Sequence, residues 1–379
     1  MITKKILNKN ASTEIQISAF IKAGIPSEYM FIIKPVNKRD TFEKQLENII
    51  SSFRTLKKDE TPMAETVFVR IFLSDAVNQA ELVNTYFKSS EYALSIVEQP
   101  PLNGSKISLW AYLQTEVEVK KLESNLFEVK HKDTTDLWST LNTYNAEGSE
   151  KEMYHIFQNY IKQLKQEGCT LADNCIRTWL YVQNVDVNYT GVVKARNDIF
   201  DQENLTRDTH TIASTGIQGR DKDYNHRVLM DSYAVKGIKK EQIQYLYATE
   251  FLSSATVYGV RFERGTCVCY ADRKHIFISG TASIDKNGYV LNVGDIRKQT
   301  LRMWENVEAL LKEAEASFED VAQISVYLRD ISDYSVVKEM FDKKFPGTPY
   351  LILYASVCRP KWLIEMECMA IAPNDGFNS

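Results

Sequence analysis

The residues with the clearest chemical potential lie in the last strand-like run, which carries two glutamates among apolar residues. Alternation along this run places Glu365 and Glu367 on one face, together with Leu363 and Met369. A carboxyl group held among apolar neighbours has a raised pKa and can donate a proton at neutral pH. A solvated sheet face explains the same pattern, so the residues alone leave both interpretations open. The opposite face is expected to pack against helices and holds Trp362, Ile364, Met366, Cys368 and Ala370.

Three other segments have residue types that suit an anionic ligand. Residues 279–281 (Ser-Gly-Thr) and the loop 213–219 (ASTGIQG) are small and hydroxyl-rich, so a ligand can approach their backbone N–H groups. The segment 258–265 (YGVRFERG) supplies two arginines, the side chain best matched to a carboxylate. Because Arg261 and Arg264 are three residues apart, an extended segment points them to opposite sides, and one is expected at the surface. A glycine bulge and an ordinary turn are the alternatives for the first two segments.

Composition excludes several large classes of protein. The chain has 379 residues and a net charge of −4, which predicts two or three domains and argues against a general nucleic-acid binder. It contains neither a GxGxxG fingerprint nor a P-loop. No apolar run approaches the roughly 18 residues of a membrane span, and the N-terminus does not resemble a signal peptide. We therefore expect a cytoplasmic protein with reduced cysteines, no metal, no cofactor and no membrane partner.

A repeated pattern sets the expected organisation of the chain. An amphipathic helix, a strand that ends in an acidic or amide turn, a second helix and a closing strand recur three times. The central strands are expected at 67–73, 175–182 and 321–328, and the turn residues are Asp75, Asn184 and Asp330. The second helices are expected at 79–87, 190–200 and 334–345, and the closing strands at 107–113, 228–235 and 363–371.

This pattern predicts an α+β protein of three tandem domains, with mixed sheets covered by helices on one face. The expected domains are residues 1–125, 126–240 and 241–379, with boundaries in the polar stretch 116–134 and the lysine-rich stretch 236–242. Three similar domains favour a pseudo-trimeric arrangement within one monomeric chain. Three unrelated α+β units that share a generic pattern are the alternative.

The third repeat resembles the YjgF-like, or Rid, superfamily, whose domains have the chorismate-mutase-like fold. The resemblance rests on SGTASI, VGDIRKQTLRMWENVEALL, VYLRDISDY and IEMECMAIA; it is strong in the third repeat and weak in the first two. It implies a degenerate, structural first domain, a second domain that contributes a substrate loop, and a catalytic third domain. Rid deaminases carry an arginine on the strand before the closing one, where this chain offers Tyr350 or Leu351. RNA cleavage, also attached to this superfamily, gains no support from the net charge.

Four motifs together resemble the chorismatases, which split chorismate into pyruvate and a cyclic acid or a hydroxybenzoate. They are TIASTGIQG, YGVRFERG, SGTASI and VCRPKWLIEME, in that order. The resemblance implies that Glu365 is the catalytic acid, that Cys358 is a second catalytic residue and that Arg264 holds a substrate carboxylate. Cys358 and Gly265 match the hydroxybenzoate-forming subtype, which favours 3-hydroxybenzoate as the product. The remaining residues assigned to the substrate are Tyr258, Arg359, Thr215, Gly216, Gly280 and Thr281.

Two departures from the chorismatase pattern affect the expected pocket. Glu263 stands where a small residue is expected, and residues 360–362 (Pro-Lys-Trp) are bulkier and more basic than usual. The leading hypothesis is therefore a cofactor-independent chorismatase-like enzyme with a small anionic substrate. The alternatives are a Rid-type enamine or imine deaminase and a non-catalytic YjgF-like protein that binds a small ligand.

Overall fold

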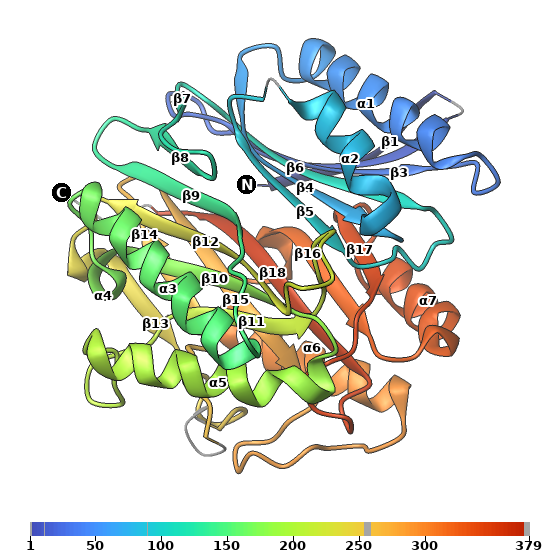
Figure 1. Cartoon of the computed structure of the whole chain (residues 1–379). Coiled ribbons are helices and arrows are strands. Elements are labelled where there is room, and N and C mark those ends of the chain that lie inside the picture. Colours follow the sequence, from blue (N-terminus) through green and yellow to red (C-terminus); the bar gives the residue numbers. More distant parts are fainter. Residues whose placement is uncertain (1, 11, 89, 254–258, 375–379) are drawn as a thin grey trace.

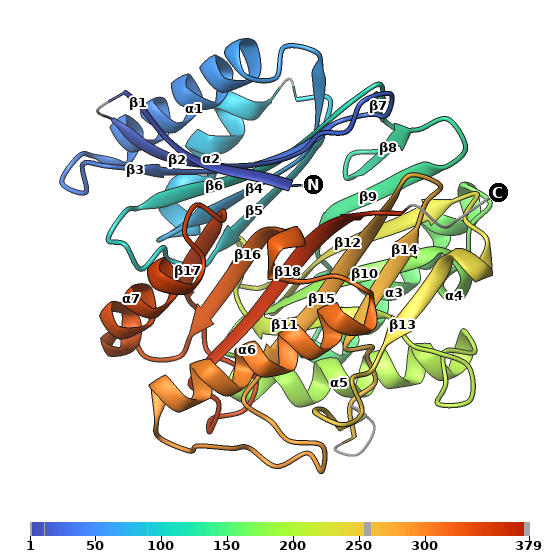
Figure 2. The same ribbon diagram turned by 180° about the vertical axis from the view of Figure 1, so that it is seen from behind.

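Three six-stranded sheets make up the chain in the computed structural model, which describes residues 2–10, 12–88, 90–253 and 259–374. The sheets follow one another along the sequence, and all three have the same strand order (Figures 1 and 2). Three antiparallel strands lead to the closing strand, which pairs with the central strand, and an edge strand runs parallel to the central one. The expected α+β fold of three tandem domains is confirmed.

The first sheet, in spatial order, contains β1 (Ile2–Asn10), β2 (Thr13–Phe20), β3 (Glu28–Pro35), β6 (Ile107–Thr115), β4 (Ala64–Leu73) and β5 (Ala93–Glu98). The second contains β7 (Glu118–Lys121), β8 (Leu126–Lys130), β9 (Thr135–Asn142), β12 (Val228–Lys236), β10 (Cys175–Val182) and β11 (Ala213–Gln218). The third contains β13 (Ile243–Leu246), β14 (Gly265–Cys269), β15 (Arg273–Ala282), β18 (Ile364–Pro373), β16 (Val321–Leu328) and β17 (Tyr350–Tyr354). Because β7 pairs with β8, the second sheet begins at Glu118, before the boundary expected at residue 125.

Each sheet carries two long helices on its outer face (Figures 1 and 2). They are α1 (Phe42–Asp59) and α2 (Ala76–Phe87), α3 (Ser149–Gln166) and α5 (Val185–Gln202), and α6 (Ile296–Glu313) and α7 (Tyr334–Lys344), with the short α4 (Leu171–Asn174) before β10. Of the helices in the described ranges, none combines the length and apolar character that a bilayer crossing requires.

The turn residues after the central strands do not all act in the expected way. Asp75 caps α2 by accepting a hydrogen bond from the Asn78 N–H, and Asp330 accepts one from the Ser332 N–H before α7. Asn184 does not cap α5 with its side chain; it adopts the left-handed conformation with φ = 47°. Gln218 at the end of β11 accepts the Val185 N–H instead, so a neighbouring strand satisfies this helix start.

The inner faces of the three sheets meet in a common apolar centre. A series of aromatic contacts crosses this centre from the first domain to the third. The distances between ring centroids are 4.7 Å for Phe68–Trp138, 4.7 Å for Trp138–Tyr233 and 5.2 Å for Tyr233–Phe277. Such pairs add to the free energy of burial. The domains therefore share one core as well as covering their own sheets with helices.

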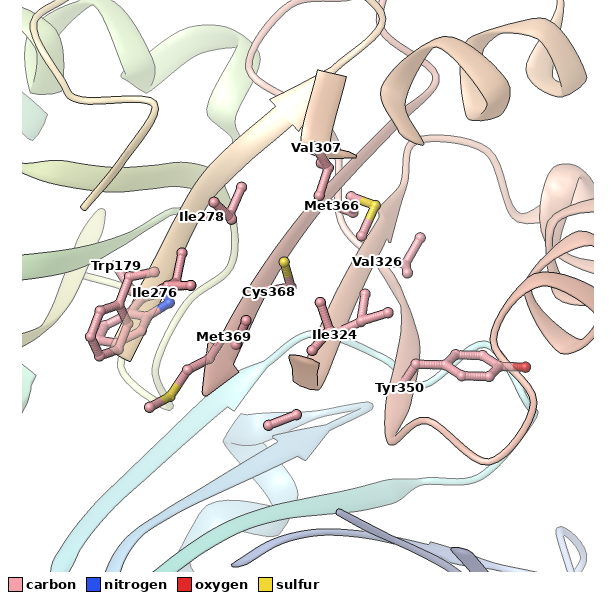
Figure 3. Packing of buried hydrophobic residues seen from close by; sticks show 14 of the residues in the cluster. Trp179, Ile276, Ile278, Val307, Ile324, Val326, Tyr350, Met366, Cys368 and Met369 are labelled. Carbon is pink, nitrogen blue, oxygen red and sulfur yellow. The ribbon is translucent and has the colours of Figure 1, made fainter. Parts of the chain in front are cut away.

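Packing inside the third domain follows the alternation expected for β18. Figure 3 shows Met366 and Cys368 beside Ile324 and Val326 of β16, with Val307 of α6 close to Met366. All five side chains are buried. This face of β18 therefore packs in the core of the third domain, and the two glutamates lie on the opposite face.

One buried ion pair crosses each domain interface: Arg70–Asp231 at 2.9 Å, Arg177–Glu367 at 2.6 Å and Arg273–Glu28 at 2.5 Å. Asp231 also accepts hydrogen bonds from the Ser95 hydroxyl at 2.5 Å and the Leu141 N–H at 3.0 Å. Removing one partner of such a pair leaves an uncompensated charge in the interior. These pairs therefore fix how the domains fit together.

The Asp231→Asn substitution tests this constraint. It leaves Arg70 buried without a counter-charge, and we expect the free energy of unfolding to fall by about 3 kcal/mol or more. Urea unfolding followed by tryptophan fluorescence measures the change. Lys151→Ala, which removes an exposed pair with Glu147, is the control and should leave the midpoint nearly unchanged. Equal effects of the two substitutions would contradict the role assigned to the interface pair.

Candidate active site

A cavity lies where the second and third domains meet. Its wall combines α5, β11, the segment before β14, the end of β15 and the loop that leads into β18. The lining residues are Tyr189, Arg196, Ser214, Gly216, Val260, Phe262, Arg264, Gly280, Ala282, Ile284, Cys358, Arg359, Trp362 and Glu365.

The position of Glu365 depends on an irregularity in the neighbouring strand. β18 pairs with β15 in register up to Ile278, and the register shifts before Thr281. Gly280 lies in this bulge, and a Cβ atom built on it would be 2.2 Å from Glu365 Oε1. Only glycine leaves room for the carboxyl group here, so the glycine bulge serves the site directly.

Glu365 is buried rather than solvated, which separates the two interpretations of its strand. The side chain is 4% exposed. Burial raises its pKa to about 8, and the nearby charge of Glu367 adds to the rise, while Arg264 and Arg177 oppose it. Glu365 therefore holds its proton at neutral pH, as a general acid requires.

Glu367 lies on the same face but faces the domain interface instead of the cavity. It accepts hydrogen bonds from Arg177 Nη2 at 2.6 Å, Thr215 Oγ1 at 2.5 Å, Trp179 Nε1 at 3.1 Å and the Tyr327 hydroxyl at 3.0 Å. Four donors saturate this carboxylate. Its role is to join the domains and to act on Glu365 through its charge.

Positive charge in the cavity comes from arginines of both domains. Arg196 of α5 is 1% exposed, and its Nε and Nη2 have no hydrogen-bond partner within the described part of the chain. Arg264 is also buried and donates from Nε and Nη2 to the Ser253 carbonyl at 3.2 and 3.0 Å. Arg359 lies over the ring of Trp362. A buried guanidinium with unsatisfied donors is costly, so Arg196 marks a place for an anion.

Cys358 and Tyr189 form a neutral pair in the same wall. Tyr189 donates a hydrogen bond to the Cys358 thiol, and burial raises the pKa of this thiol to about 12, with a further rise from Glu365. A thiol with this pKa is protonated at neutral pH and is a poor nucleophile. Gly216 allows the tyrosine to approach, since a Cβ there would be 2.6 Å from the Tyr189 ring.

Six of the residues expected from sequence line the cavity: Glu365, Cys358, Arg264, Arg359, Gly216 and Gly280. Three others, Thr215, Thr281 and Gly265, do not line it. Thr215 lies behind the wall, where its hydroxyl contacts Glu367 and accepts the Gly280 N–H. Thr281 donates to the Ser279 carbonyl, and Gly265 packs against Leu246, Ile278 and Phe277 in the sheet. Tyr258 lies outside the described residues.

The residues that depart from the chorismatase pattern affect the cavity differently. Glu263 does not reach the cavity, because its carboxylate accepts the N–H and hydroxyl of Thr211 at 2.7 and 3.0 Å. Trp362 does line the cavity and adds bulk to it. Arg261 pairs with Asp201 near the surface while Arg264 is buried, as their spacing predicts.

The two positions where the Rid resemblance places an arginine lie away from this cavity. Tyr350 of β17 donates its N–H to Gln16 of the first domain, and neither it nor Leu351 lines the cavity. The edge strand at the cavity is β11 of the second domain, which presents Ser214 and Gly216. The two β11 residues that line the cavity are thus a serine and a glycine, not the arginine that Rid deaminases carry on the strand before the closing one.

Sequence reasoning missed Tyr189 and Arg196, which both belong to α5. A signal for Arg196 existed, because it falls in the apolar stripe of Val192, Ala195 and Ile199. An arginine inside a buried helix face requires an explanation. The sequence did not reveal which cavity this face borders.

The comparisons with known proteins agree with this architecture. Residues 267–372 match the family model described as endoribonuclease L-PSP. A RutC family protein of Pyrococcus abyssi is 39% identical over 97 residues, which are 25% of this chain and 76% of that protein. A RutC family protein of Pyrococcus horikoshii is 37% identical over 98 residues, 25% of this chain and 77% of that protein. The chain belongs to the RutC family.

A solved structure extends the likeness of this RutC family protein beyond its third domain. The crystal structure of a chorismatase superposes with a TM-score of 0.63 and 16% identity, covering 80% of this chain and 92% of that chain. At this identity the likeness is one of fold. The resemblance to chorismatases and the YjgF-like superfamily is confirmed at that level.

The buried state of Glu365 can be tested through stability. The folded protein keeps a proton that the unfolded chain releases above about pH 4.5, because the pKa rises to about 8 on folding. The stability of the native protein therefore falls between these pH values and levels off above pH 8. Glu365→Gln does not titrate, so its melting temperature relative to the native protein should rise over this range. A pH-independent difference between the two melting temperatures would show that Glu365 titrates normally.

Proposed function

We propose that this protein cleaves the enol ether of chorismate to give pyruvate and a hydroxybenzoate, 3-hydroxybenzoate being preferred, with Glu365 as the general acid. The observation that carries the proposal is the meeting of two groups in one cavity. One is the buried, protonated carboxyl group of Glu365, and the other is the buried guanidinium of Arg196, whose Nε and Nη2 have no hydrogen-bond partner among the described residues. Chorismate has two carboxylates and an acid-labile enol ether. A proton donor and anion-binding groups are what its cleavage requires.

The reaction starts with proton transfer from Glu365 to the methylene carbon of the enolpyruvyl group. This gives an oxocarbenium ion, which the neighbouring ring hydroxyl captures with loss of its proton to form a cyclic ketal. The C–O bond between the ring and the captured oxygen then breaks, and this oxygen becomes the carbonyl oxygen of pyruvate. The ether oxygen separates from the pyruvyl carbon, takes up a proton and stays on the ring, which gives 3-hydroxybenzoate. The atoms of chorismate equal those of pyruvate and hydroxybenzoate together, so no net water is consumed. The carboxylate of Glu365 regains its proton when the ring aromatises. Arg196 and Arg264 hold the two substrate carboxylates, and both are already fixed in the free protein.

Cys358 has a positioning role in this scheme. Its thiol is neutral, because burial raises its pKa to about 12, so covalent attack on the substrate is not assigned to it. It lies in the wall beside Glu365 together with Tyr189. A small apolar group at this place excludes water from the cation and favours capture by the ring hydroxyl.

Binding of chorismate requires the cavity to open. Its enclosed volume is about 30 Å³, close to the volume of one water molecule. Arg359 and Cys358 are only half-buried, so this part of the wall has the freedom to move. Closure around the substrate would then exclude water from Glu365.

Pyruvate release from chorismate tests the proposal. The purified protein should release pyruvate, with kcat/KM constant below about pH 8 and falling above it as Glu365 loses its proton. Glu365→Gln should reduce kcat by roughly 100-fold or more, while Glu315→Gln at an exposed pair should not. No pyruvate from the native protein would overturn the proposal. Ammonia release from an imine would then favour the deaminase, and binding without turnover a ligand-binding protein.

Arg196→Met tests the anion-binding role by two readouts. Loss of a charge-assisted contact should raise KM for chorismate roughly 10- to 100-fold. The same change should raise the unfolding midpoint of the ligand-free protein, because it removes a buried cation whose Nε and Nη2 lack hydrogen-bond partners among the described residues. Arg196→Lys retains a charge and should fall between the two proteins in KM. An unchanged KM with a lower unfolding midpoint would assign Arg196 a purely structural role.

A further inference from the structure

A second cavity lies in the first domain, on the outer face of its sheet between α1 and α2. Its volume is about 470 Å³, which is within the usual range for small-molecule sites. Figure 1 shows α1 and α2 on the opposite side of the molecule from α5, which borders the candidate active site. The lining residues are Ile50, Phe53, Arg54, Lys57, Lys58, Pro62, Thr66, Tyr86, Phe87 and Tyr92.

The interior of this cavity is apolar and largely aromatic. Phe53 and Phe87 are buried at 6% and 7% exposure, and Tyr86 and Tyr92 are half-buried around them. These rings come from α1, from α2 and from the residue just before β5, so they line the space from different elements. Aromatic side chains arranged in this way favour a flat, aromatic ligand over a branched one.

The charged residues of the cavity are all cationic. Arg54, Lys57 and Lys58 lie on one side of α1, and the lining includes no acidic residue. Lys57 has an exposed partner, Glu65, at 3.5 Å, and such a pair contributes little. The positive charge of Arg54 acts on the Tyr92 hydroxyl, which places the guanidinium close to the aromatic interior.

A buried hydroxyl in the wall also lacks a partner. Thr66 at the start of β4 is 3% exposed, and its Oγ1 has no hydrogen-bond partner in the described chain. Unsatisfied buried polar groups are uncommon in folded proteins. A ligand with a hydrogen-bonding group against this wall would satisfy it.

The space between the helices is not a requirement of the fold. In the second domain, α3 and α5 lie so close that a Cβ on Gly191 would be 2.5 Å from the Ser149 hydroxyl. The same topology therefore allows helices in direct contact. The first domain instead keeps its two helices apart over an aromatic floor.

We propose that this cavity binds a small aromatic carboxylate, with the ring between the phenylalanines and tyrosines and the carboxylate at Arg54 and Lys58. Arginine binds carboxylates through two parallel hydrogen bonds, and the neighbouring lysine adds to the attraction. The first domain thus has a ligand-binding role of its own, which does not depend on the chemistry at Glu365.

Fluorine NMR titration with 4-fluorobenzoate tests this site in the full-length protein. The Arg196→Met background removes one of the two arginines assigned to carboxylates in the other cavity and so weakens binding there. Binding that remains at that cavity is the same in the variant and in the control, because both are made in this background. We expect saturable binding that the Arg54→Glu/Lys58→Glu variant weakens roughly tenfold or more. Both substituted residues are exposed, so the fold should tolerate them. The matched control, Lys44→Glu/Lys151→Glu, makes the same change of net charge at exposed positions outside the cavity.

The remaining results of the titration distinguish specific binding in this cavity from attraction to surface charge. Equal binding by the variant and the control, or no saturable binding, would overturn the proposal. Competition by inorganic phosphate as strong as by benzoate would show attraction to surface charge alone and would also overturn it. Cyclohexanecarboxylate tests the aromatic preference and should bind more weakly than benzoate. Failure of chorismate turnover would leave these binding results unaffected, so the two proposals fail separately.

Discussion

The buried ion pair between Arg177 and Glu367 is the constraint on which the candidate site depends. It joins β10 of the second domain to β18 of the third, and both side chains are almost fully buried. Because side chains alternate along a strand, the orientation of Glu367 towards Arg177 also turns Glu365 towards the second domain. The interaction that aligns the two domains therefore places the acid in the cavity between them. The charge of Glu367 then helps to keep the proton on Glu365.

The three repeats share one topology, but they carry different residues at the closing-strand position that Glu365 occupies. One position of the central strand, three residues before the turn residue, can be compared in all three repeats. It is occupied by Phe72, Tyr181 and Tyr327, and each of these pairs with one residue of the closing strand. The paired residues are Ser108, Leu229 and Glu365. Only the third repeat has a carboxyl group at this position. The first two closing strands serve the shared core and the interfaces, Asp231 being the ionic residue of the second.

The repeats and the placement of the two glutamates on one strand face were predictable from sequence because both depend on local periodicity, whereas the burial of Glu365 was not. Helical and strand patterns gave the element order, and alternation placed Glu365 and Glu367 together. The orientation of β11 was not predictable, since both its faces carry small polar residues; Ser214 and Gly216 face the cavity, whereas Thr215 faces Glu367. The contribution of Arg196 depends on how α5 docks against another domain, which no local pattern specifies. The capping of α5 by Gln218 is a long-range contact of the same kind.

The electrostatics of the free cavity favour a substrate with two negative charges. Arg196 and Arg264 are buried there, and Glu365 is neutral because burial raises its pKa to about 8. In the proposed reaction, a carboxylate bound beside Glu365 opposes its ionisation, so a bound dianion would keep the proton in place until the reaction begins. Proton transfer would then create a carboxylate next to an oxocarbenium ion, and each charge would stabilise the other in a cavity with little water. The proposal therefore uses the same charges in sequence: the arginines attract the dianion, and the ionised acid stabilises the cation that its proton has formed.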